Sequence, residues 1–99
     1  MKLIFTALAE QQAGEMDEWW RDHRVEARES FARELAAARE LIAATPSIGG
    51  PYIAGSGRAV RRVLLPKTQN HVYFEVDEAN DVIVVLAVWG APRGSGPRF

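Results

Sequence analysis

Apolar residues recur at helical spacing in two segments of the first half of the chain. The first segment shows spacings of four, three and four, at Ala9, Ala13, Met16 and Trp20. Such spacing places these side chains on one helical face. Thr6 directly precedes the pattern and is a good N-cap residue, so we expect a helix from residue 7 to about residue 22.

The second pattern is stronger and has the same spacing, at Phe31, Leu35, Ala38 and Ile42. Neither proline nor glycine separates the two patterns, yet one rod over residues 7–44 would be about 57 Å long. A compact chain of this size has a radius of gyration near ~13 Å. We therefore place a turn in the polar segment at residues 21–24 and predict a helical hairpin that ends at Thr45 and Pro46.

The remaining segments predict strands. We expect a short first strand at residues 2–6, a loop at 45–57, and strands at 59–65, 71–77 and 82–89. The last of these is apolar on both faces, which indicates an interior strand. Residues 90–99 form an irregular tail. The expected fold is α+β in the order βααβββ, a single domain over residues 1–99 with the hairpin on one face of a mainly antiparallel sheet.

Two adjacent arginines occupy the strand at 59–65. Successive strand residues point to opposite faces, so Arg61 and Arg62 lie on different sides of the sheet. We expect one to lie at the edge of the helix-covered core and pair with a helix glutamate. The other stands on the open face, which would form a polar and aromatic groove if it also carries His71 and Tyr73.

Tryptophans mark two further positions. Trp20 lies on the apolar face of the first helix, and Trp19, about 100° away, is expected at the border of the core. Trp89 ends the last strand, where we expect it to cap the core beside the tail.

Composition narrows the class of protein. The chain has 99 residues, is 47% hydrophobic and 25% charged, and carries a net charge of −1. The balance is −3 over residues 1–57 and +2 over 58–99. Such mild asymmetry argues against direct nucleic-acid binding. With no cysteine, signal peptide or membrane-length apolar segment, we expect a soluble, cytoplasmic protein without membrane contact, cofactor or metal.

The chain lacks an obvious catalytic set. Metal-free cleavage of RNA needs a base, an acid and cations around the phosphate. The histidines are His23, in the expected helical turn, and His71, at the start of a strand; the tail contains no tyrosine. The interpretation from the residues is a protein that binds other macromolecules, without catalytic residues and without enzymatic activity.

Several motifs resemble those of a known superfamily. These are "FTALAE", "LIAATPSIGGPY", "VRRVLL", "HVYFEVDEANDVIVVLAVW" and the tail "GAPRGSGP". Together they resemble the ParE branch of the RelE/ParE superfamily, the toxins of type II toxin–antitoxin systems, over essentially the whole chain.

The resemblance implies a growth-inhibiting toxin that forms a hetero-oligomer with a cognate antitoxin. For ParE-type members it also implies DNA gyrase as a target that is bound without chemistry, whereas RelE-type members cleave messenger RNA on the ribosome. The family tail commonly has a histidine followed by a basic pair. Here Gly90 and the single Arg93 stand at these positions, which argues against acid–base catalysis by the tail.

We therefore expect the sheet face to bind the antitoxin and the tail to help engage the target. The candidate binding residues are Arg61, Arg62, His71, Tyr73, Trp89 and Arg93. Two alternatives stay open: a RelE-like ribosome-dependent endonuclease, and a non-toxic binding module with the same fold.

Overall fold

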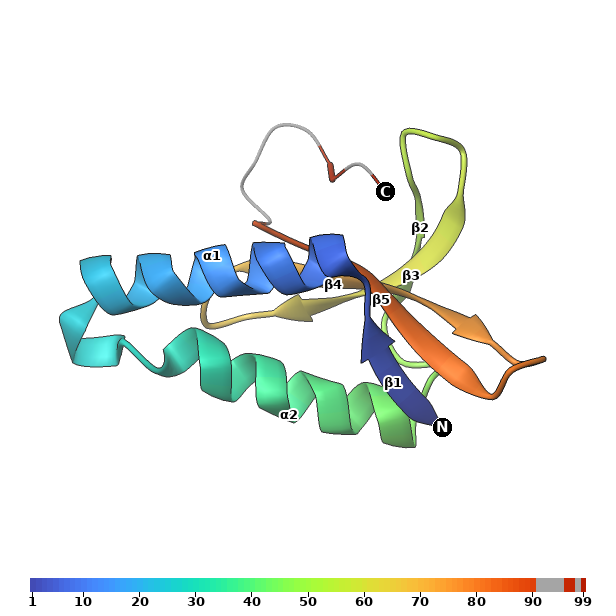
Figure 1. Cartoon of the computed structure of the whole chain (residues 1–99), viewed down its shortest axis with the longest axis horizontal. Coiled ribbons are helices and arrows are strands. Elements are labelled where there is room, and N and C mark those ends of the chain that lie inside the picture. Colours follow the sequence, from blue (N-terminus) through green and yellow to red (C-terminus); the bar gives the residue numbers. More distant parts are fainter. Residues whose placement is uncertain (91–95, 98) are drawn as a thin grey trace.

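Two helices cover one face of a five-stranded sheet (Figure 1). The computed structural model describes residues 1–90, 96–97 and 99. In chain order its elements are β1 (Lys2–Phe5), α1 (Ala7–His23), the 3₁₀ turn η1 (Val25–Ala27), α2 (Ser30–Ala44), β2 (Gly50–Ile53), β3 (Ala59–Leu65), β4 (Asn70–Asp77) and β5 (Val82–Gly90). The expected α+β class, with a helical hairpin on one face of the sheet, is confirmed.

The helices begin and end close to the positions that the sequence indicates. The Thr6 hydroxyl oxygen accepts a hydrogen bond from the Ala9 amide at 3.1 Å, which satisfies one of the free donors at the start of α1. The chain reverses at residues 24–29, just after the polar segment at which the turn was expected. Each helix is supported by an ion pair between residues four apart: Asp17–Arg21 on α1, and Glu29–Arg33 at the start of α2, where Glu29 is the N-cap residue.

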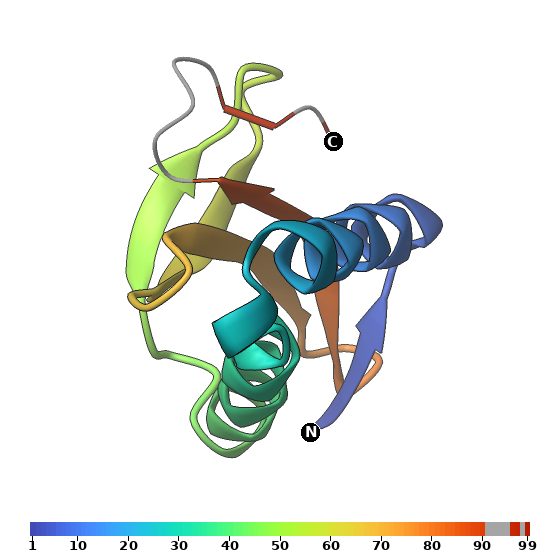
Figure 2. The same cartoon turned by 90° about the vertical axis from the view of Figure 1, so that its left-hand side faces the viewer.

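The sheet has the strand order β1-β5-β4-β3-β2. β1 is parallel to β5, and the other neighbouring strands are antiparallel. As the apolar run at residues 82–89 predicts, β5 is an interior strand. β2 and β1 form the two edges (Figure 2).

One strand was not expected. The segment 45–57 was predicted to be a loop, but it contains β2, in which Tyr52 pairs with Val60 of β3. Pro51 lacks a backbone N–H and is tolerated because β2 is an edge strand with one unpaired side. Pairing with β3, rather than the propensity of a four-residue segment that contains proline and glycine, makes this segment a strand.

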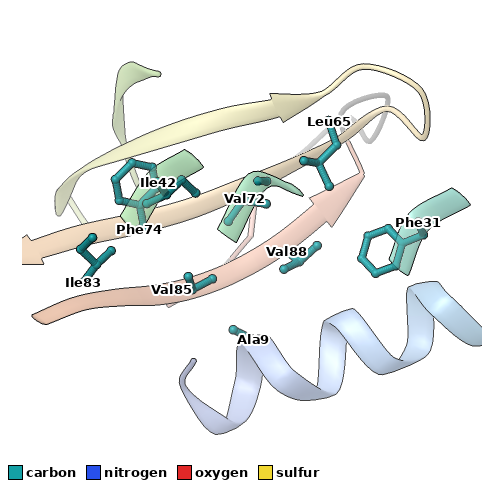
Figure 3. Close-up of a cluster of buried hydrophobic side chains, with 10 residues drawn as sticks. Ala9, Phe31, Ile42, Leu65, Val72, Phe74, Ile83, Val85 and Val88 are labelled. Carbon is teal, nitrogen blue, oxygen red and sulfur yellow. The ribbon is translucent and has the colours of Figure 1, made fainter. Parts of the chain in front are cut away.

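The main core lies between the sheet and the helices (Figure 3). Val72 and Phe74 of β4 point into it, as the alternation of that strand predicts. The buried side chains of this cluster are Ala9, Phe31, Ala38, Ile42, Leu65, Val72, Phe74, Ile83, Val85 and Val88. They are aliphatic or phenylalanine, so this face of the sheet contributes stability through burial of apolar surface.

A β-bulge interrupts the pairing of β4 with β5. Tyr73 pairs with Ala87, but the next residue, Phe74, pairs with Val85, so Leu86 is an extra residue on β5. Leu86 and Ala87 consequently pack on the same side of the sheet, away from the main core. The apolar residues 82–89 of β5 thus contribute buried side chains to both faces of the sheet, and the bulge determines which side Leu86 and Ala87 take.

Neither α1 nor α2 is long and apolar enough to cross a membrane, and the same holds for every helix in the described part of the chain.

Candidate functional site

The face of the sheet opposite the helices carries a group of aromatic side chains and one arginine. We name it the aromatic cluster; its members are Tyr52 of β2, Arg62 of β3, His71 and Tyr73 of β4, and Phe99 near the C-terminus. The alternation of β3 and β4 places Arg62, His71 and Tyr73 on this face, whereas the sequence left open which of the two arginines would lie here. The structure therefore brings three of the six candidate residues together.

Ring contacts centred on Tyr73 hold the cluster together. The Tyr73 ring centroid lies 4.9 Å from that of Tyr52, 5.9 Å from that of His71 and 5.7 Å from that of Phe99. The Arg62 guanidinium carbon lies 4.8 Å from the centre of the Tyr52 ring. Such tilted ring pairs and a cation over a ring face are favourable arrangements.

Burial and charge fix the protonation states of this group. Desolvation, assisted by the nearby Arg62 guanidinium, lowers the pKa of His71 from its usual 6.5. Desolvation raises the pKa of Tyr73 above its usual 10.0, although Arg62 acts in the opposite direction. At neutral pH His71 is therefore a neutral imidazole and Tyr73 a neutral phenol. The positive charge of the cluster belongs to Arg62.

Arg61 lies on the other, helix-covered face and contacts backbone instead. Its Nε donates to the Ile48 carbonyl oxygen at 3.0 Å, and its Nη2 donates to the carbonyls of Gly49, at 2.7 Å, and Ser47. The expected partner was a helix glutamate, and the observed contacts correct that expectation. The reason is proximity, because the loop that follows α2 passes directly over the Arg61 side chain.

Gly49 makes this loop possible. Its φ of +84° is a left-handed conformation that glycine adopts without strain, and an added Cβ would overlap the Arg62 carbonyl oxygen. The loop can therefore approach β3 closely enough for its carbonyls to reach Arg61. In this structure Arg61 holds the connection between α2 and β2.

The remaining two candidate residues lie at or beyond the end of β5. Trp89 packs against the buried residues of the open face, which include Tyr73 and Leu86. Arg93 lies outside the described residues.

A hollow of about 700 Å³ separates α1 from the β3–β4 turn. Its lining includes Leu8, Met16, Trp20 and Asn70. Trp19, 42% exposed, also lines the hollow and stacks on the His23 ring, with 4.7 Å between the ring centroids. Trp20 packs against the main core, as its helical position predicts.

Sequence reasoning missed two members of the aromatic cluster, Tyr52 and Phe99. Tyr52 lies in the segment predicted to be a loop, and Phe99 lies in the predicted irregular tail. A signal existed for Tyr52, because the segment Tyr52–Ile53 combines two residues that favour strands. No local pattern indicates the return of Phe99 to the sheet.

Within the described residues, no group of three or more histidine or carboxylate side chains could hold a metal ion.

Comparison with known proteins identifies the family. No curated protein matches the chain as a relative. Residues 3–93 match the model of a family described as "ParE toxin of type II toxin-antitoxin system, parDE". Since this match spans nearly the whole chain, the protein belongs to the ParE toxin family of type II toxin–antitoxin systems.

Proposed function

We propose that this toxin acts by binding, that its antitoxin neutralises it by lying across the open sheet face, and that its target is DNA gyrase. The observation that supports the proposal most is the aromatic cluster with Arg62, on a face that neither helix covers. Tyrosine and arginine are the residues that most often dominate the energy of protein–protein contacts.

The charge of the open face favours an antitoxin segment with acidic and apolar side chains. Arg62 supplies the positive charge of the aromatic cluster. Elsewhere on this face, Glu75 of β4 forms an ion pair with Arg58, with Arg58 Nε 3.2 Å from Glu75 Oε2. A carboxylate of the partner near Arg62 would complement this positive charge.

Gyrase as the target follows from the resemblance to the ParE branch and agrees with the charge of the chain. A net charge of −1 offers little general attraction to ribosomal RNA, whose recognition depends strongly on phosphate neutralisation. A protein target makes no such demand.

A pair of activity assays tests the proposal. Purified toxin should inhibit supercoiling by gyrase and should leave messenger RNA intact in a translation-coupled assay, and addition of the antitoxin should restore supercoiling. In the Arg62→Ala variant the antitoxin should restore supercoiling only at higher concentration. The matched control is Arg33→Ala, which removes an exposed arginine of α2 on the opposite side of the molecule. Cleaved messenger RNA without any effect on gyrase would contradict the proposal.

Messenger RNA cleavage is a second candidate function, because the structure brings an imidazole, two phenols and a guanidinium together. Two features favour binding instead. Tyr73 is only 2% exposed, so a substrate can hardly reach it, and its raised pKa keeps the phenol protonated at neutral pH, so it cannot serve as the base. If His71 served in acid–base catalysis, His71→Gln would lower cleavage by about 10²–10⁴-fold. If His71 only contributes to binding, His71→Gln should change the affinity for the antitoxin by a much smaller factor.

A further inference from the structure

The open sheet face already has an occupant, the C-terminal residues of the same chain. The C-terminus lies on the side of the sheet away from α2 (Figure 2). Pro97 is buried and Phe99 is half-buried. Tyr73 lies on a face without helices and yet is 2% exposed, so neighbours other than a helix must cover it. Phe99, which packs against its buried cluster, is one of them.

The contact at Gly96 is specific for a residue without a side chain. A Cβ added at Gly96 would overlap the Tyr52 hydroxyl oxygen and would lie 3.3 Å from Tyr52 Cζ. Backbone therefore passes directly over the Tyr52 hydroxyl, and any side chain at this position must push the two groups apart.

Three residues later the chain places an aromatic ring beside Tyr73, with 5.7 Å between centroids and 46° between the ring planes. The rings of Tyr52 and Tyr73 are themselves in contact, at 4.9 Å. The face thus accommodates a segment with a small residue over Tyr52 and an aromatic residue over Tyr73. This arrangement describes the kind of ligand that the surface fits.

We infer that Gly96, Pro97 and Phe99 act as an intramolecular ligand of the open face, and that the antitoxin segment that binds this face must displace them. The second half of the inference rests on the proposed function; the first half depends only on the contacts of the free toxin. An attached ligand lowers the apparent affinity of any competitor, because only the fraction of molecules with a free surface can bind it.

The test uses the full-length chain and a pair of compensating substitutions. Gly96→Ala places a methyl group against the Tyr52 hydroxyl and should release the C-terminal residues. Tyr52→Phe removes that hydroxyl, so the combination Gly96→Ala with Tyr52→Phe should let them return. The control is Gly55→Ala, in the neighbouring turn, where an added Cβ meets no atom within 4 Å.

The first measurement concerns the free toxin. Nuclear Overhauser effects between the Phe99 and Tyr73 rings should be present in the parent chain, lost in Gly96→Ala, and present in the double variant and in Gly55→Ala. Cross-peaks that persist unchanged in Gly96→Ala, or that are absent in the parent chain, would overturn the inference that these residues occupy the face.

A synthetic peptide of residues 90–99 provides a probe that needs no partner protein. Added in trans, it should shift the Tyr73 resonances of Gly96→Ala but not those of the parent chain. In the parent chain the attached C-terminal residues have an effective concentration in the millimolar range, and the added peptide is too dilute to compete with them. Equal shifts in the two proteins would overturn competition for one surface.

Displacement of the C-terminal residues by the antitoxin is tested with the protein encoded by the antitoxin gene adjacent to the toxin gene. Its association with Gly96→Ala should be about 3–10-fold faster than with the parent chain, in proportion to the released fraction. The double variant should associate at the parent rate. If Gly96→Ala loses the contact between the Phe99 and Tyr73 rings but associates with the antitoxin at the parent rate, the antitoxin does not need to displace the C-terminal residues. That result would leave the proposal that the antitoxin binds this face unaffected. Binding that leaves the Tyr73 resonances unmoved would instead contradict the proposed function, whatever the C-terminus does.

Discussion

The two faces of this sheet differ in composition although they share the same strands. The buried side chains of the helix-covered face are aliphatic or phenylalanine, whereas the open face combines aliphatic residues such as Val60 and Leu86 with tyrosine, histidine and arginine. Arg61 and Arg62 show the difference within two consecutive residues. Arg61 binds three backbone carbonyls and holds a loop, and Arg62 stacks on an aromatic ring of the open face. The alternation of a β-strand thus gives two neighbouring arginines entirely different surroundings.

The largest effect should come from the covered face. Phe74 is fully buried beneath the helices, and Phe74→Ala should lower the free energy of unfolding by about 3–5 kcal/mol through lost burial and a cavity. Urea denaturation would measure it. Leu64→Ala, at a 44% exposed position of β3, is the control and should change stability by about 0.5 kcal/mol or less. Similar losses for the two variants would mean that the division between the faces is wrong.

The two arginines should respond in different assays. Arg61→Ala should lower the free energy of unfolding by about 1–2 kcal/mol, because three loop carbonyls lose a charged donor. Antitoxin affinity should change little, as measured by calorimetric titration of the folded variant. Arg61→Lys should not restore stability, since an ammonium group lacks the planar geometry that reaches three carbonyls together. A large loss of affinity with unchanged stability would reassign Arg61 to the interface.

Arg62→Ala should show the reverse behaviour. We expect antitoxin affinity to fall by roughly 30-fold, about 2 kcal/mol, as is typical of an arginine at the centre of an interface. Stability should fall by only about 0.5–1 kcal/mol, the value of an exposed cation–π contact. If affinity is unaffected, the antitoxin does not use this part of the open face.

The smallest effect should be a dependence on pH. The pKa of His71 is lower in the folded protein than in the unfolded chain, where it is about 6.5. As the pH falls below that value, the unfolded chain takes up a proton that folded His71 resists, so stability should decrease until the pH reaches the folded pKa. His71→Gln should remove this component. In Arg62→Ala, NMR titration should show the His71 pKa rising part of the way to its usual value, because burial is the larger cause.

Much of the covered face could be predicted from the sequence. Helical spacing placed Phe31 and Ile42 in the core, and alternation separated Phe74 from Tyr73. These predictions succeed because burial under two helices imposes a regular pattern on each element. The Thr6 cap succeeds for the same reason, since it depends on a contact within one turn of helix.

The open face was harder to predict because its contacts join segments that have no periodicity. β2 forms a strand by pairing with β3, and the partners of Arg61 depend on a loop shaped by a left-handed glycine. The bulge at Leu86 is hidden within an unbroken apolar run. Phe99 reaches Tyr73 through a segment of glycine and proline, whose composition indicates only the absence of regular structure.

The parallel pairing of β1 with β5 has a consequence for the synthesis of this protein. Lys2 is aligned with Val82, and β1 has no other strand beside it. On the ribosome, the first strand must therefore wait for the last one to be translated before it can enter the sheet. Because β5 is also an interior strand that contributes side chains to both faces, neither face can be completed before residues 82–90 have been translated.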